Sequence, residues 1–79
     1  MNRITREILE RQVTNLNKLL PLEPRQFHIS SQIGGHSLRL GIPYEADSDV
    51  FGTGHVTARE MHVLIRALVR GIELERNKL

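Results

Sequence analysis

Apolar residues recur with helical spacing in the first part of the chain, from Arg3 to Leu20. One side of a helical wheel collects the apolar positions Ile8, Leu9, Val13, Leu16, Leu19 and Leu20. The other side carries the polar residues Arg3, Arg6, Glu7, Glu10, Arg11, Asn17 and Lys18. Glu7 precedes Arg11 by four residues, the spacing that favours an ion pair on a helix surface. Pro21 and Pro24 lack the amide hydrogen that a helix needs, so we predict an amphipathic helix over residues 3–20.

The period of the pattern changes to two after the prolines. Polar and apolar residues alternate over 25–31 and again over 37–42, as expected of half-buried strands. The apolar positions are Phe27, Ile29, Leu38, Leu40 and Ile42. Gly34-Gly35 between the two runs supplies the positive φ of a tight turn. The pattern predicts a β-hairpin with one apolar face, and it places on or near the exposed face His28, His36 and Arg39.

A polar, turn-rich segment follows the hairpin. Pro43 is expected to end the second strand, and a short third strand around Val50 is an open alternative. Residues 47–49 begin like a calcium-binding loop, but Phe51 and Ala58 stand at the fifth and twelfth positions, where oxygen ligands are needed. We therefore expect the two aspartates of this segment to be solvated or to cap the loop.

The second helix is predicted from Thr57 to about Arg76. Thr57 and Glu60 form a capping box, in which the Thr57 oxygen accepts the Glu60 amide and the Glu60 side chain reaches back to the Thr57 amide. One face of this helix is apolar and holds Met61, Leu64, Ile65, Leu68, Val69 and Ile72. Together these elements predict a single α+β domain over residues 1–79, in the order α-β-β-α, with an antiparallel hairpin packed on two helices.

The length of 79 residues is close to the limit at which one core stabilises a fold. Cysteine is absent, and the four histidines lack the spacing of a metal site, so disulfides, a metal centre and a cofactor are not expected. Self-association remains, and we predict a homo-oligomer, most simply a dimer. The second helix leaves residues outside its core face, and the predicted interface consists of Val63, Arg66, Ala67, Arg70 and Leu74.

The formal net charge is +2 and the sequence pI is about 9.7, which permits anionic partners. No stretch approaches the roughly twenty apolar residues of a membrane span, so we expect a soluble intracellular protein. The sequence shows no spacing of serine, histidine and carboxylate that indicates nucleophilic catalysis, and we predict a protein that is not an enzyme.

Residues 52–57 form a glycine-bearing loop that leads into the second helix. Free amides and the positive end of a helix dipole favour an anion at such a place, although the spacing matches neither a Walker A loop nor a dinucleotide fingerprint. We predict an anionic, phosphate-bearing small molecule as ligand. The candidate ligand-binding residues are His36, Arg39, Gly52, Gly54, His55, Thr57 and Arg59. The alternative is that the glycines only allow a tight approach to the helix.

Arginines along one side of the second helix favour a second function, nucleic-acid binding. Arg59, Arg66 and Arg70 recur at helical spacing, and phosphate contacts need little more than such a row. The chain has one Tyr, two Phe and no Trp, too few for a surface that stacks bases. The same arginines are equally suited to pairing with acids of another subunit.

The second helix resembles a motif, T-x-R-E-L-Y-x-x-L-x-A-F-x-x-G, of a widespread group of small bacteriophage proteins with a Gly-Gly hairpin. The matching residues here are Gly34, Gly35, Thr57, Arg59, Glu60, Leu64, Ala67 and Gly71. Met61, His62 and Leu68 stand where the motif has leucine, tyrosine and phenylalanine. The resemblance implies a phage accessory protein in the cytoplasm of an infected bacterial host. It also implies action by binding, either as an anti-defence protein that sequesters a nucleotide signal of bacterial immunity or as an inhibitor of a host protein.

Overall fold

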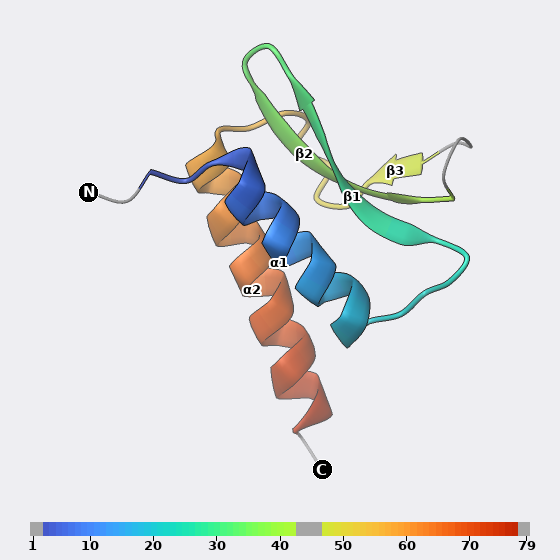
Figure 1. Cartoon of the computed structure of the whole chain (residues 1–79). Coiled ribbons are helices and arrows are strands. Elements are labelled where there is room, and N and C mark those ends of the chain that lie inside the picture. Colours follow the sequence, from blue (N-terminus) through green and yellow to red (C-terminus); the bar gives the residue numbers. More distant parts are fainter. Residues whose placement is uncertain (1–2, 43–46, 78–79) are drawn as a thin grey trace.

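The computed structural model describes residues 3–42 and 47–77 and shows two helices packed on one face of an antiparallel sheet (Figure 1). The elements follow one another as α1 (Arg6–Leu19), β1 (Gln26–Gln32), β2 (Gly35–Gly41), β3 (Asp47–Asp49) and α2 (Ala58–Arg76). The predicted α+β class is confirmed, and so is the order of the elements along the chain, in which the hairpin follows the first helix and precedes the second. Pro43, the predicted end of the second strand, lies outside the described residues.

Helix α1 begins three residues later than the apolar pattern predicted. Thr5 is its N-cap, with extended backbone, and its hydroxyl oxygen accepts a hydrogen bond from the Ile8 amide at 3.4 Å. A capping threonine has non-helical φ and ψ, so residues 3–5 do not continue the helix. The predicted ion pair between Glu7 and Arg11 is present, with 3.1 Å between Arg11 Nη2 and Glu7 Oε1.

The sheet has the strand order β1-β2-β3, with both pairs antiparallel. The third strand occupies Asp47–Asp49, just before the position expected from Val50, whose amide donates to the Leu38 carbonyl at 2.9 Å. The chain then leaves the sheet and returns at Val56, which forms a bridge with His36. β3 and this bridge therefore both pair with the edge of β2 that faces away from β1.

The core lies between the sheet and the helices, where α1 packs on β1 and α2 packs on β2. Its buried side chains are Leu9, Val13, Leu16, Phe27, Ile29, Leu38, Met61 and Ile65. These side chains share one layer because they recur with helical spacing in α1 and α2 and at alternate positions in β1 and β2. The other face of the sheet carries polar side chains, among them His28 of β1 and Arg39 of β2, and neither helix covers it (Figure 1).

A side chain of α1 occupies part of the free edge of β1. Asn17 Nδ2 donates to the Phe27 carbonyl at 3.0 Å, and the Phe27 amide donates to Asn17 Oδ1 at 2.8 Å. The asparagine amide thus takes the place of a peptide group of a neighbouring strand. The apolar pattern put Asn17 on the solvent side of the helix, and this was wrong, since the residue is half-buried against β1.

Candidate functional site

The glycine-bearing loop before α2 already holds a carboxylate. Asp49 Oδ1 accepts the amides of Phe51 at 3.2 Å and Gly52 at 3.1 Å, and Asp49 Oδ2 accepts the Gly54 amide at 2.8 Å. Gly52 and Gly54 have φ of 67° and 70°, a region that favours glycine and that turns these amides inward. The anion expected at this loop is therefore supplied by Asp49, one of the two aspartates for which a capping role was open.

The N-terminus of α2 carries the predicted cap with one difference. Thr57 Oγ1 accepts the Glu60 amide at 3.1 Å, as expected. The Thr57 hydroxyl also donates to Glu60 Oε1 at 3.1 Å, where the sequence predicted a bond from the Thr57 amide. The Glu60 carboxylate consequently lies at the positive end of the helix dipole, the place proposed for an external anion.

His36 is tied to its neighbours through both backbone and side chain. Its amide donates to the Val56 carbonyl at 2.7 Å, and its carbonyl accepts the Val56 amide at 2.8 Å. Its ring Nδ1 lies 2.7 Å from the Ser31 hydroxyl oxygen. The two backbone hydrogen bonds hold Val56 against the edge of β2. His36 therefore has a structural role, which the sequence pattern did not indicate.

Arg39 belongs to a cluster on the open face of the sheet. Its Nε donates to Asp47 Oδ1 at 2.6 Å, and His28 Nε2 lies 2.9 Å from Asp47 Oδ2. The hydrogen bond from Arg39 holds the pKa of the Asp47 carboxyl below its ordinary 3.8, with partial burial opposing and His28 assisting. One carboxylate thus orients two basic side chains from neighbouring strands.

A hollow of about 620 Å³ lies over this cluster. We call it the sheet hollow, and its lining consists of Arg6, His28, Ile29, Ser30, Ser31, Gln32, Arg39, Asp47 and His55. It brings together two of the seven candidate ligand-binding residues, Arg39 and His55. Thr57 and Arg59 line a different hollow, at the start of α2. The remaining candidates are His36 and the two glycines engaged by Asp49.

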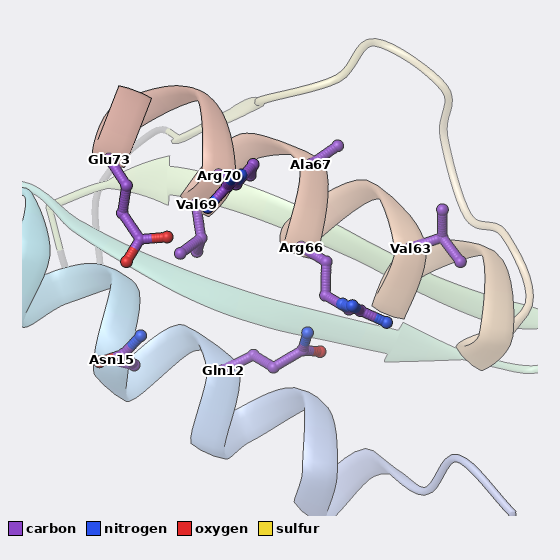
Figure 2. Close-up of a pocket in the computed structure, with 8 residues that line it drawn as sticks. All are labelled: Gln12, Asn15, Val63, Arg66, Ala67, Val69, Arg70 and Glu73. Atoms are coloured by element: carbon purple, nitrogen blue, oxygen red, sulfur yellow. The ribbon is translucent and has the colours of Figure 1, made fainter. Parts of the chain in front are cut away.

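A groove of about 570 Å³ runs between α1 and α2 on the side away from the sheet (Figure 2). Its lining consists of Gln12, Asn15, Val63, Arg66, Ala67, Val69, Arg70 and Glu73. Four of the five predicted interface residues therefore lie together, and the fifth, Leu74, is exposed beyond the groove. Gln12 Nε2 donates to the His62 carbonyl at 3.3 Å across the floor of the groove.

Asp47 and His28 are the residues of the sheet hollow that the sequence did not single out as a pair. Their contact depends on β3 lying beside β2, and three residues with the sequence Asp-Ser-Asp give no strand pattern. Asp49 did leave a signal, since aspartate before a glycine loop often accepts amides two residues later. Within residues 3–42 and 47–77 no group of three or more His, Asp or Glu side chains is placed to hold a metal ion.

Neither helix of the described part is long and apolar enough to cross a membrane. Comparison of the chain with protein-family models, with curated proteins and with solved structures finds no match. The resemblance of α2 to small phage proteins therefore stays a prediction, and the function has to be argued from the sheet hollow and from the surfaces of the helices.

Proposed function

We propose that this protein is a non-catalytic binding protein that holds a small phosphate-bearing ligand in the sheet hollow. The observation that supports the proposal is the charge of this one hollow. Its lining holds four basic side chains, those of Arg6, His28, Arg39 and His55, and one carboxylate, that of Asp47. Ser30 and Gln32, which lie on the same face of β1, add side chains of the kind that hydrogen-bond to phosphate oxygens.

Arg39 is the proposed centre of the site. Its Nε is fixed by Asp47, while its two terminal nitrogens form no hydrogen bond or ion pair with the residues that the structure describes. The N–H groups of these two nitrogens can donate parallel hydrogen bonds to two oxygens of one phosphate group. Asp47 repels a phosphate, so the ligand has to bind on the side of the guanidinium away from it.

Within the setting that the phage resemblance implies, the ligand would be a nucleotide signal of bacterial immunity, sequestered in the cytoplasm of the infected host. No covalent step is part of this function, because binding alone lowers the concentration of the free signal. The homo-oligomer is part of the same proposal, supported by the exposed Val63 and Leu74 of α2.

The test is thermal unfolding in the presence of inorganic phosphate, pyrophosphate and a panel of linear and cyclic nucleotides. A ligand at 100 times its Kd stabilises the fold by about 2.7 kcal/mol, which raises Tm by roughly 10–20 °C in a domain of this size. If no compound of the panel raises Tm, the proposal is wrong.

A matched pair of variants locates the site. Arg6 and Arg11 both lie on α1, and each pairs with a glutamate four residues away, at 3.0 and 3.1 Å. Only Arg6 lines the sheet hollow. Arg6→Gln should weaken binding about tenfold through the loss of a charged hydrogen bond, and Arg11→Gln should leave it unchanged. Equal losses in the two variants would contradict a site in the hollow.

Nucleic-acid binding is the second candidate, supported by three exposed arginines of α2. Arg59, Arg66 and Arg70 take part in no ion pair with residues 3–42 or 47–77. Fluorescence anisotropy with labelled DNA at several salt concentrations tests it, because log K falls by about 0.9 per phosphate contacted for each unit of log salt. A protein inhibitor that uses this same side of α2 is the remaining alternative, for which capture of a host protein by the exposed helix is the test.

A further inference from the structure

Helix α2 has an exposed stripe opposite its core face. We call it the outer stripe, and it consists of Val63, Ala67, Arg70 and Leu74. The steps of four, three and four residues keep these positions on one line along the helix, as in the seam between two packed helices. Val63 and Leu74 are each 57% exposed, although both are large apolar side chains.

Among the described residues, the hydrophobic core and the side chains packed against it include no member of the outer stripe. Met61 and Ile65, on the opposite side of α2, are fully buried against the sheet and α1. In the described part of the chain the large apolar side chains left exposed are Ile33, Val63 and Leu74, and two of these three lie on the stripe. A line that is apolar except for Arg70, and that stays exposed in the described part of the chain, indicates a surface for a partner.

We propose that a second copy of this chain covers the outer stripe, with its α2 antiparallel to the first and a two-fold axis between Leu68 and Val69. In this register Val63 lies opposite the partner's Leu74, and Ala67 lies opposite the partner's Arg70. Ala67, the small side chain of the stripe, then faces a large one, which lets the two helices approach closely there. The inference gives a surface and a register to the homo-oligomer of the proposed function and rests on it, but it does not depend on phosphate binding.

The charges beside the stripe favour the antiparallel direction. Arg66 and Glu73 both flank the stripe on the side of α1 (Figure 2), and neither forms an ion pair with a described residue. In the proposed register the partner's Gly71 lies directly opposite Arg66, and the partner's Glu73, two residues further along the same flank, is the acid beside Arg66. The two-fold axis repeats the pair. A parallel two-fold arrangement would place this flank of one helix beside the opposite flank of its partner, so Arg66 and the partner's Glu73 would not meet.

An apolar hollow lies where the partner's Leu74 is expected. Its volume is about 600 Å³, and its lining consists of Thr53, Val56, Thr57, Arg59, Glu60, Val63 and Leu64. It is at the level of Val63, the residue opposite the partner's Leu74 in this register. The stripe provides the projecting side chain, and the hollow beside Val63, at the N-terminal end of the stripe, receives it. This self-complementarity is the reason for choosing a second copy as the occupant.

Light scattering of the whole chain tests the association. The expected mass is twice the 9.1 kDa of one chain. Val63→Glu places a charge against the partner's Leu74 and should raise the dimer dissociation constant about a hundredfold or more. Ile33→Glu is the matched control, since it makes the same kind of change at an exposed side chain of the β1–β2 turn, and it should leave the mass unchanged. The mass of one chain for the unmodified protein would overturn the inference.

Cysteine pairing tests the register, because the chain has no cysteine of its own. An oxidised mixture of Val63→Cys and Leu74→Cys chains should give a cross-linked dimer, while either variant alone should give little. A dimer in which Val63→Cys cross-links with itself would overturn the antiparallel register and leave the oligomer of the proposed function standing. Failure of phosphate to raise Tm would leave this inference untouched.

Charge reversal gives a second measure of the register. Arg66→Glu should weaken the dimer about tenfold, since it replaces two attractive pairs by two repulsive ones. Adding Glu73→Arg to that variant should restore the affinity, which loss of helix structure would not do. Persistence of the tenfold loss in the double variant would contradict the pairing of Arg66 with the partner's Glu73. Because the dimer uses Arg66, it also competes with nucleic-acid binding along α2.

Discussion

The asparagine that closes the edge of β1 should be among the most sensitive polar residues of the fold. Asn17→Ala removes two hydrogen bonds, of 2.8 and 3.0 Å, to the backbone of Phe27. Each is worth about 0.5–1.5 kcal/mol net, and the half-buried peptide groups of Phe27 lose their partners together. Alanine favours a helix over asparagine by roughly 0.5 kcal/mol, which offsets part of the loss. We therefore expect Asn17→Ala to destabilise the protein by about 1–2.5 kcal/mol.

Asn15 offers a matched control on the same helix. It is exposed at the groove between the helices, and its side chain forms no hydrogen bond with the described residues. Asn15→Ala gains the same helix propensity without losing a contact, so it should be neutral or stabilise by a few tenths of a kcal/mol.

Urea unfolding followed by circular dichroism measures both variants. Asn17→Ala should lower the midpoint while the m-value stays constant, because the surface exposed on unfolding is nearly the same. Hydrogen exchange of the Phe27 amide should also become faster in this variant alone. Equal stability of the Asn15→Ala and Asn17→Ala proteins would refute the reasoning, since it would mean that water replaces the asparagine amide without cost.

Three further predictions concern the loop, the sheet hollow and two glycines. Asp49→Ala leaves three loop amides without their acceptor and should cost about 2 kcal/mol in urea unfolding; an unchanged midpoint would show that the loop does not need it. The pKa of Asp47 is lowered in the folded state, so the carboxylate contributes stability above its ordinary value of 3.8, and this contribution is lost as pH falls through the folded pKa. The stability difference between the natural protein and Asp47→Asn should therefore be larger at pH 7 than at pH 3, and an equal difference would contradict the contact with Arg39. Gly35→Ala puts a methyl group 2.6 Å from the Val56 carbonyl oxygen and should destabilise, whereas Gly71→Ala meets no described atom within 4 Å and should stabilise by up to about 1 kcal/mol. Thermal unfolding of both glycine variants checks the opposite signs, and the same sign in both would contradict the close approach at Gly35.

The parts of the fold that the sequence predicted depend on neighbours in the chain. Thr57 and Glu60 are three residues apart, so their capping contact follows from the pattern alone, and α2 begins where it was expected. Alternation likewise gave the two long strands, with the turn at Gly34. The start of α1 was misplaced because Thr5 fits the apolar periodicity and a cap equally well, and only the geometry separates the two.

The site was predicted less well because its contacts join residues that are distant in the chain. Arg39 was named, but its acceptor Asp47 reaches it only when β3 pairs with β2. The contact of Asn17 could not be predicted, since its partner is the backbone of a residue ten positions away. Every residue has a peptide group, so the sequence does not indicate which one a side chain will bind. A periodic pattern says which side of a helix faces the core, and it does not say which polar side chain there finds a backbone to bind.

The carboxylate in the loop before α2 acts as a ligand that the chain carries with it. A group tethered two to five residues from the amides it binds is present at an effective concentration on the order of millimolar or above, so a dissolved anion competes poorly for the same place. The loop has the form of an anion receptor kept permanently filled, and a single substitution, Asp49→Gly, would vacate it. Acetate or phosphate should then recover part of the stability lost in that variant, and a loop that now serves only to connect β3 with α2 would become a binding site.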